Sequence, residues 1–500
     1  MSTAAMTRDP RQDETKRLDA LFAGEPDRLS RLSFEVAGIY FDWSKTHLDA
    51  GLVAAGLERA EAMGFGAARE ALFAGAIVNI SEGRAATHVA ERGSGAPEDA
   101  DLASARRQRT RALVDAIEAD VFGPVTAVLH IGIGGSVLGP ALLVDALGRK
   151  RAGPNVRFLS NIDGAAFDAA VDGLDPVTTL VVAASKTFTT AETLANLEAA
   201  LGWLAGGGVV DPHGRVIAVT AAPEAALAYG IDESRILVFG EGVGGRYSLW
   251  SAVGVSAALA LGWSAFEELL EGAAEMDRHF RFAEPAANAP LIAAIADRYY
   301  VEQRGCQTRA VFAYEERLRL LTPYLQQLEM ESNGKSTKSD GVALDGPSAP
   351  VTWGGTGTDA QHAVFQLLHQ GTVLVPVEFV AAVEDDDAQD PDHHRLLLLN
   401  AFAQGAALMA GRASEDAQRN YPGDRPSSTV LLDRLDARSL GALIAFYEHR
   451  TFANAALIGV NPFDQFGVEL GKDIARQMDD SDDPVELDIS TRALMERAGL

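Results

Sequence analysis

Cysteine is almost absent from this 500-residue sequence, because Cys306 is the only one, so no disulfide can form within the chain. A reducing compartment suits such a chain, and we expect the cytoplasm as its location. No apolar run approaches the roughly 18 residues that a membrane span requires. Residues 1–17 contain no apolar segment of the kind found in secretory signals. The low aromatic content, 7 %, leaves an apolar fraction rich in Ala, Leu and Val, which suits helices layered over a parallel sheet.

Positive charge is also scarce, with 43 Lys and Arg against 70 Asp and Glu and a net charge of -27. The resulting field repels phosphate backbones and anionic lipids, so nucleic acid and membrane are excluded as expected partners. A small phosphorylated substrate is compatible with this charge if a local pocket supplies the donors. We interpret the acidic runs at 383–392 and 479–488 as solvated loops or tail.

Short apolar runs alternate with helical patterns from residue 125 onward. This alternation predicts βαβ units and a parallel sheet buried on both faces. The runs are 125–134, 156–163, 178–186, 215–221 and 235–240.

A Pro/Ala-rich segment, 283–290, separates this series from a second one, and we interpret it as a domain boundary. The predicted strands of the second series are 308–316, 372–383 and 427–435. Residues 11–110 have mostly helical patterns, although 28–45 are ambiguous. The predicted fold class is therefore α/β, with two doubly wound domains and N-terminal helices. The first, smaller domain is expected at 115–282, and the larger one at 1–114 and 283–500.

The glycine-rich stretch "HIGIGGSVLGP" (130–140) follows a predicted strand and opens a helix. Gly132 and Gly134 fit the start of a dinucleotide fingerprint, and Asp163 lies where an acid for the ribose is expected, but Val137 replaces the third glycine. The alternative is an anion site made of backbone N–H groups and the Ser136 hydroxyl. Tight packing alone is the third interpretation, and this stretch by itself does not choose among them.

The stretch "ASKTFTTAET" (184–193) is richer in donors. Ser185, Lys186, Thr187, Thr189 and Thr190 follow a predicted strand and precede a helix. Converging hydroxyl and ammonium donors at a helix N-terminus are suited to a phosphate monoester, whereas the alternative is a helix cap with spare hydroxyls. A dinucleotide would not need this second cluster, so it weakens the oxidoreductase interpretation.

Further candidates carry isolated charges. Arg246, after a glycine pair, could stabilise an oxyanion or make a structural salt bridge. His362 and His369 lie seven apart and so share one face of a predicted helix. Lys472 follows Gly471, where an exposed helix lysine is the ordinary interpretation.

Two carboxylates, Glu329 and Glu331, lie where a predicted helix gives way to "SNGK". They are either a solvated helix end or a general base at the mouth of a sheet. The pair His393 and His394 lies in an acidic loop without a metal-binding pattern, so we expect no metal.

Taken together, these motifs resemble the glucose-6-phosphate isomerase family. The resemblance runs from about residue 79 to 475 and includes the family's blocks in order. These blocks are "NISEGRAATHVAER" (79–92), "GIGGSVLGP" (132–140), "SKTFTTAET" (185–193), "GGRYSLWSAVG" (244–254), "YLQQLEMESNGK" (324–335), "GTDAQHAVFQLLHQGT" (357–372), "RPSSTVLLDRLDARSLGALIAFYEHR" (425–450) and "FDQFGVELGK" (463–472).

The resemblance implies two αβα sugar-isomerase domains, a homodimer with shared active sites, and no metal or organic cofactor. It implies Glu331 as the catalytic base, His362 and Lys472 in ring opening, and Arg246 facing the enediolate, with His362 supplied by the partner subunit. Glu329 is interpreted as a solvated neighbour. Implied substrate contacts are Gly135, Ser136, Ser185, Lys186, Thr187, Thr190, Gln327 and Gln465.

The sequence also departs from the family pattern. Ala86, Thr87 and Glu91 stand where the family usually has larger apolar residues, so packing near the site is in question. The expected reaction is the interconversion of glucose 6-phosphate and fructose 6-phosphate in glycolysis and gluconeogenesis, by proton transfer through an enediol. The alternative is a regulatory protein that binds sugar phosphates without catalysis.

Overall fold

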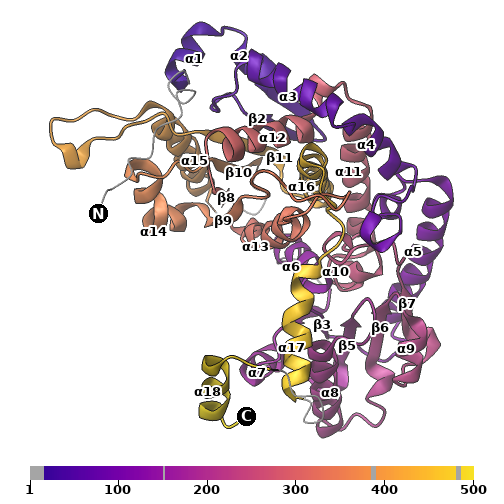
Figure 1. Cartoon of the computed structure of the whole chain (residues 1–500). Coiled ribbons are helices and arrows are strands. Elements are labelled where there is room, and N and C mark those ends of the chain that lie inside the picture. The colour runs from indigo at the N-terminus through magenta and orange to yellow at the C-terminus, as the bar shows by residue number, and fades with distance from the viewer. Residues whose placement is uncertain (1–15, 150–152, 385–389, 480–485) are drawn as a thin grey trace. The chain divides into compact units, whose positions relative to one another are not determined.

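The apolar runs between residues 125 and 240 form a five-stranded parallel sheet in the computed structural model, which describes residues 16–149, 153–384, 390–479 and 486–500 (Figure 1). The strand order is β4-β3-β5-β6-β7. Chain order reverses beside β3, and its neighbour β5 is parallel to it, so the loops after these two strands meet at one edge of the sheet. The strands are β3 (Ala127–Ile131), β4 (Asn155–Leu159), β5 (Thr179–Ala184), β6 (Val216–Thr220) and β7 (Ile236–Val238).

Helices cover both faces of this first sheet. Leu129 and Ile131 pack with Leu197 and Leu204 in a core formed with α7, α8 and α9. The intervening His130 reaches Ser256 on the opposite face, where α6 and α10 lie. Alternation along the strand thus gives the two-sided burial expected of a parallel sheet. The helices are α6 (Gly135–Leu147), α7 (Gly164–Val171), α8 (Ala191–Gly206), α9 (Pro223–Ala228) and α10 (Val255–Leu261).

A second, six-stranded sheet has the order β1-β2-β11-β10-β8-β9. Its last four strands in this order are parallel to one another, whereas β2 is antiparallel to β11 and β1 to β2. The sheet is therefore mainly parallel with an antiparallel edge. Its strands are β1 (Ser33–Val36), β2 (Ile39–Asp42), β8 (Thr308–Tyr314), β9 (Val351–Thr356), β10 (Val377–Glu384) and β11 (Ser427–Arg434).

The segment 28–45, which the sequence left ambiguous, forms α2 (Arg28–Leu32) and the β1–β2 hairpin. Ala37 and Gly38 join the two strands with φ of 52° and 71°, the left-handed pair that a two-residue hairpin turn requires. The strand β9 was not predicted. Its Gly354 has φ 149°, and a Cβ there would lie 1.8 Å from the Val311 carbonyl oxygen, so this position requires glycine. A glycine adds no apolar side chain, and the strand therefore lacks the apolar pattern of its neighbours.

Helices also enclose the second sheet. Phe312, Tyr314 and Phe379 of the sheet pack against Phe365 and Leu368 of α14 in the main core on one face. On the other face α16 is buried along nearly its whole length. The helices around this sheet are α11 (Trp263–Phe282), α12 (Ala289–Arg298), α13 (Leu321–Leu325), α14 (Gly357–Gln370), α15 (Pro391–Ala410) and α16 (Ala437–Ile458).

Two short π-helical segments extend α12 and α13. The first, η10 (Tyr299–Gln303), ends before Gly305, and the second is η12 (Gln326–Glu331). The remaining helices before the first sheet are α1 (Leu18–Gly24), α3 (Ala50–Ala62), α4 (Phe65–Phe73) and α5 (Pro97–Glu118). Single 3₁₀ turns are η2 (Ile80–Glu82), η3 (Ala90–Arg92), η4 (Pro176–Thr178), η5 (His213–Arg215), η6 (Glu233–Arg235), η7 (Gly245–Tyr247), η8 (Ala252–Gly254), η9 (Pro285–Ala287), η11 (Glu316–Leu318) and η13 (Ala417–Arg419).

Contacts within the chain divide it into two units, one up to Pro462 and one from Phe463 to Leu500. The second unit contains η14 (Phe466–Val468), α17 (Glu469–Asp479) and α18 (Ile489–Ala498). Among the helices of the described residues, none is long and apolar enough to cross a membrane.

Some predictions fall outside the described residues. Residues 1–15 and parts of the acidic runs 383–392 and 479–488 are among them. The first sheet lies wholly between residues 127 and 238, and the second joins strands on both sides of it in sequence. The domain boundaries 115–282 and 1–114 with 283–500 stay predictions.

Candidate active site

The glycine-rich turn after β3 is the meeting point of three sequence motifs. Gly134 has φ 57°, and a Cβ there would lie 2.7 Å from the Nε2 atom of Gln327. At Gly135 a Cβ would lie 2.1 Å from the Gly245 carbonyl carbon. Gly135 therefore requires glycine because the Gly245 backbone approaches so closely, whereas Gly134 requires it because a positive φ is strained for other residues. The turn before α6, the Arg246 loop and the η12 turn are thus in contact.

His130, on β3, stabilises this turn by a hydrogen bond to its backbone. Its Nε2 lies 2.8 Å from the Ser136 carbonyl oxygen, which can only accept, so Nε2 carries the hydrogen. Its Nδ1 lies 2.8 Å from Ser256 Oγ and accepts from that hydroxyl. Burial lowers the pKa of His130 to about 4, so the imidazole is neutral. His130 therefore fixes the backbone at Ser136.

The hydroxyl-rich loop after β5 lies at the same sheet edge and opens α8. Ser185 Oγ lies 3.0 Å from Thr190 Oγ1, and Thr187 Oγ1 lies 2.7 Å from Thr189 Oγ1. Thr190 is the N-cap residue of α8, so these hydroxyls surround a helix N-terminus. Backbone N–H groups and the helix dipole favour an anion at such a place.

Lys186 ties this loop to the segment that precedes Arg246. Its Nζ donates to the Glu241 carbonyl oxygen at 2.7 Å and to the Val243 carbonyl oxygen at 3.2 Å. Burial, with the positive charge of Arg84, lowers the pKa of Lys186 to about 8. The ammonium group is thus desolvated and held against the segment that precedes Arg246.

Arg246 is buried, and its guanidinium group is held on several sides. Nε donates to Ser332 Oγ at 2.6 Å, and Nη2 donates to the Pro462 carbonyl oxygen. Tyr247 also places its hydroxyl 2.9 Å from Ser332 Oγ. Nη1 lies 3.3 Å from Glu331 Oε1, so the guanidinium faces the carboxylate expected to be the base. The salt-bridge interpretation of Arg246 is confirmed, and its role at an oxyanion stays a prediction.

Glu331 ends the η12 π-helix, and about a fifth of its side chain is exposed (21 %). Lys335 Nζ donates to the Glu331 carbonyl oxygen at 2.8 Å. The backbone at Glu331 is therefore fixed, and its partly exposed carboxylate is accessible to a small molecule.

The interpretation of Glu329 as a solvated neighbour was wrong. Glu329 is buried, its carboxylate is paired with Arg309, and Thr352 donates a hydrogen bond to it. The sequence pattern placed it at a helix end but did not show that β8 and β9 supply these partners from the interior.

His362 and His369 lie on α14, as predicted. His369 Nε2 lies 2.9 Å from Gln404 Oε1, which supports a structural role. The His362 side chain is exposed, and within the described residues its imidazole has no hydrogen bond or ion pair. Within the described residues, no hydrogen bond or ion pair joins His362 to Glu331 or Arg246 of the same chain.

Gln465 and Lys472 belong to the second unit. Gln465 precedes η14, and Lys472 is exposed on α17. Their predicted roles at the sugar stay predictions.

Ser332 and Tyr247 are site residues that sequence reasoning missed. Ser332 was read as a residue that stops a helix, although its place directly after Glu331 was a signal. Tyr247 follows Arg246 in the same block and is buried. Their hydrogen bonds fix the guanidinium that the sequence could only place on a loop.

The residues that depart from the family pattern are accommodated without large apolar groups. Ala86 is buried, and the Thr87 N–H donates to the Gly242 carbonyl oxygen at 3.0 Å. Glu91 is buried, and burial raises its pKa to about 7 although Arg106 and Arg107 oppose the shift. This segment therefore supports the Arg246 loop through its backbone.

The acid expected for a dinucleotide ribose has another role. Asp163 is the N-cap residue of α7, and its carboxylate accepts from the Ala165 N–H at 2.9 Å.

The glycine-rich turn is in contact with Gln327 and Gly245. The geometry fits the class of α/β enzymes that bind a small phosphorylated molecule and move a proton.

Comparison with known proteins narrows this class. A model of the phosphoglucose isomerase family matches residues 42–495. Glucose-6-phosphate isomerase of Rhizorhabdus wittichii is 65 % identical over 481 residues, covering 96 % of either chain. The same enzyme of Sphingopyxis alaskensis is 62 % identical over 486 residues, covering 97 % of either chain. A crystal structure of a glucose-6-phosphate isomerase from Chlamydia trachomatis is similar with a TM-score of 0.86 and 32 % identity, covering 93 % of this chain and 92 % of that one. The chain belongs to the phosphoglucose isomerase family.

Proposed function

We propose that this protein interconverts glucose 6-phosphate and fructose 6-phosphate, with Glu331 carrying the proton between C2 and C1. Removal of the C2 proton leaves an enediolate, and return of the proton to C1 completes the aldose-to-ketose change. The Arg246 guanidinium stabilises the enediolate charge. One observation carries this assignment: the partly exposed Glu331 carboxylate lies 3.3 Å from the buried Arg246 guanidinium, beside the glycine-rich turn.

The phosphate group of the substrate is held at the edge of the first sheet. Its oxygens accept from the turn at Gly135 and Ser136 and from the loop side chains Ser185, Lys186, Thr187 and Thr190. Two facts support this placement. The loops follow neighbouring parallel strands, and the ammonium group of Lys186 is partly desolvated by burial, which lowers its pKa. Gln327, which touches Gly134, and Gln465 contact the sugar.

Ring opening is assigned to His362 and Lys472, and His362 serves the site of the partner subunit in a homodimer. The exposure of His362 on α14 supports this arrangement. The neighbouring helices α14 and α15 also carry half-exposed apolar side chains, as a subunit interface would: Leu367, Leu396, Leu399 and Phe402, 46–50 % exposed.

The remaining assignments follow from the reaction. The protein acts in glycolysis and gluconeogenesis, and we place it in the cytoplasm. The chemistry of the assigned residues needs no metal or organic cofactor. Residues 115–282 form the first sugar-isomerase domain, and 1–114 with 283–500 form the second. The comparisons give no support to a non-catalytic sugar-phosphate sensor.

The decisive experiment is a coupled assay of glucose 6-phosphate formation from fructose 6-phosphate, with Glu331→Gln beside the unaltered protein. Glutamine keeps the shape of the side chain but cannot accept the proton, so we expect kcat to fall by roughly 10²–10⁴-fold. KM should change far less, because the phosphate loops are untouched. A Glu331→Gln variant with kcat near that of the unaltered protein would show that another group is the base.

A further inference from the structure

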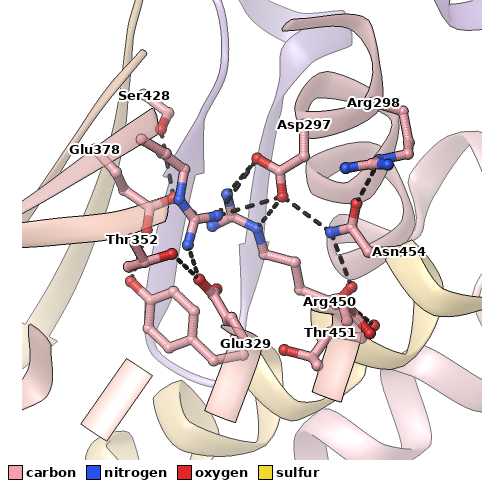
Figure 2. A network of polar contacts seen from close by, with 12 residues as sticks. Asp297, Arg298, Glu329, Thr352, Glu378, Ser428, Arg450, Thr451 and Asn454 are labelled. Atoms are coloured by element: carbon pink, nitrogen blue, oxygen red, sulfur yellow. Dashed lines mark hydrogen bonds and ion pairs between the residues drawn. The ribbon is translucent and has the colours of Figure 1, made fainter. Parts of the chain in front are cut away.

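A buried network of charged side chains joins the turn that carries Glu331 to the second sheet. In Figure 2, Glu329, Thr352 and Asp297 converge from different elements. Glu329 lies on η12, two residues before Glu331, whereas Thr352 lies on β9 and Asp297 on α12. The mechanism proposed above makes no use of this network.

Glu329 is held by two donors at one carboxylate oxygen. Arg309 Nη2 and Thr352 Oγ1 both donate to Glu329 Oε2, the latter at 2.7 Å. Glu329 is 7 % exposed, Arg309 4 % and Thr352 1 %. A buried pair of this kind is strongly unfavourable to break, because the remaining charge is left without compensation. The Glu329 side chain therefore has one strongly favoured position.

Arg309 is in turn fixed to the rigid parts of the fold. It lies on β8, and its Nη1 is 3.3 Å and 3.4 Å from the two carboxylate oxygens of Asp297. Arg450 of α16 donates to the same two oxygens at 2.7 Å and 2.8 Å, and to Glu378 of β10 at 2.7 Å (Figure 2). The chain of contacts thus connects Glu329 to two helices and to the central strands of the sheet.

The turn itself has an uncommon backbone. π-Helical segments are rare and occur frequently at functional sites. Within η12 the two carboxylates have different surroundings: Glu329 is in the buried network, and Glu331 faces Arg246 at 3.3 Å. Ser332 is bonded to Arg246, and Asn333 Nδ2 donates to the Thr451 carbonyl oxygen at 2.9 Å. The backbone between these contacts is held from both sides.

We propose that Glu329 is a positioning residue for the reaction: by binding Arg309 and Thr352 it fixes the η12 turn, so that Glu331 meets the substrate in one orientation. The inference rests on the proposed role of Glu331 as the base. A displacement of about 1 Å at a reacting group can lower a rate about 10²-fold. Glu329 does not touch the substrate, so its effect passes through Glu331.

The test compares Glu329→Gln and Thr352→Val with the unaltered protein in the coupled assay. Glu329→Gln removes the charge that pairs with Arg309, and we expect kcat to fall about 10²-fold with KM within about two-fold. Thr352→Val keeps the shape and removes only the 2.7 Å hydrogen bond, so its loss of kcat should be in the same direction but smaller. If Glu329→Gln is poorly folded, Thr352→Val alone carries the test.

A matched control separates positioning from general loss of stability. Glu25→Gln removes the carboxylate partner of the buried Arg28, 2.9 Å away, outside the site. It should be less stable than the unaltered protein with kcat unchanged. An equal loss of kcat in Glu25→Gln and Glu329→Gln would overturn the proposal.

The double variant Glu329→Gln/Glu331→Gln provides the sharper readout. A residue that acts only through Glu331 adds nothing once Glu331 is gone, so kcat should equal that of Glu331→Gln within about two-fold. A further fall in proportion to the Glu329→Gln effect would overturn the positioning role. If Glu331→Gln is inactive while Glu329→Gln has normal kcat, only this inference fails. If Glu331→Gln is fully active, the proposed function fails first.

Discussion

Glu91 is a buried carboxyl group whose titration should be visible in the stability of the protein. Burial raises its pKa to about 7 from an ordinary value of 4.5, with Arg106 and Arg107 opposing the shift. Between these two pH values the folded protein keeps a proton that the unfolded chain has released. Its contribution is therefore fully present below about pH 4.5 and is lost as pH rises through 7, a change of about 3 kcal/mol.

We therefore predict that Glu91→Gln gains stability relative to the unaltered protein as pH rises from 4.5 to 7. Glutamine has no proton to lose, so the variant lacks this titration. The midpoint of urea unfolding at pH 5 and at pH 7.5 measures the difference. The control is Glu118→Gln, which removes an exposed glutamate from α5. A difference between Glu91→Gln and the unaltered protein that is the same at both pH values would contradict the buried titration.

At the scale of elements, the loop between β5 and α8 should control substrate affinity through Lys186. We predict that Lys186→Met raises KM for fructose 6-phosphate by roughly 10–150-fold, because one charge-assisted contact contributes about 1.5–3 kcal/mol. Because the pKa of Lys186 is lowered to about 8, kcat/KM of the unaltered protein should also fall above that pH, and the variant should lack this limb. An unchanged KM would show that phosphate binds elsewhere. Thr178→Val, at the residue before the opposite end of β5, is the control, since its hydroxyl contacts Thr126 Oγ1 and the Asp175 carbonyl oxygen, away from the loop.

The elements also show what the sequence could and could not reveal. Each predicted strand from residue 125 to 240 exists, because burial on both faces gives an apolar run that is hard to mistake. The strand β9 was missed because Gly354 packs its backbone on Val311 and needs no side chain. Glu329 was misread for a related reason: Arg309 and Thr352, which bury it, come from strands 20 and 23 residues away in sequence. Local patterns do not carry such contacts.

The site was predictable to a different degree. The glycine-rich turn, the hydroxyl-rich loop, Arg246 and Glu331 each have a local signature in the sequence. The turn and the loop lie at the same sheet edge because they follow neighbouring parallel strands. The supporting contacts of His130, Ser332 and Tyr247 could not, because they depend on how three loops pack. The placement of Gln465 and Lys472 at the sugar stays a prediction.

At the scale of the whole molecule, the proposed homodimer with shared sites predicts complementation between inactive variants. Glu331→Gln and His362→Ala homodimers should each be nearly inactive. In their heterodimer one site combines both defects, and the other receives intact Glu331 and intact His362. Equal co-expression gives about half heterodimers with one good site of two, so roughly a quarter of the unaltered activity should return.

The measurement is the coupled assay on the co-expressed mixture, and on heterodimers purified from it with two different affinity tags, which should have about half of the unaltered activity per dimer. Mixing the finished homodimers without exchange of subunits is the control and should restore nothing. A heterodimer as inactive as its parents would show that His362 acts within its own chain or has no part in the reaction.

The single thiol of the chain gives the fold a natural chemical reporter. Cys306 lies between η10 and β8, is 3 % exposed, and donates its N–H to the Tyr300 carbonyl oxygen at 2.9 Å. Burial raises the pKa of this thiol to about 11, so little of the reactive thiolate exists near neutral pH. Alkylating reagents should reach it only when the second sheet opens, so the labelling rate at one known atom measures how often that core comes apart. Because the chain has no other cysteine, mass spectrometry of the intact chain would give the fraction of molecules labelled at each time from a single addition of mass.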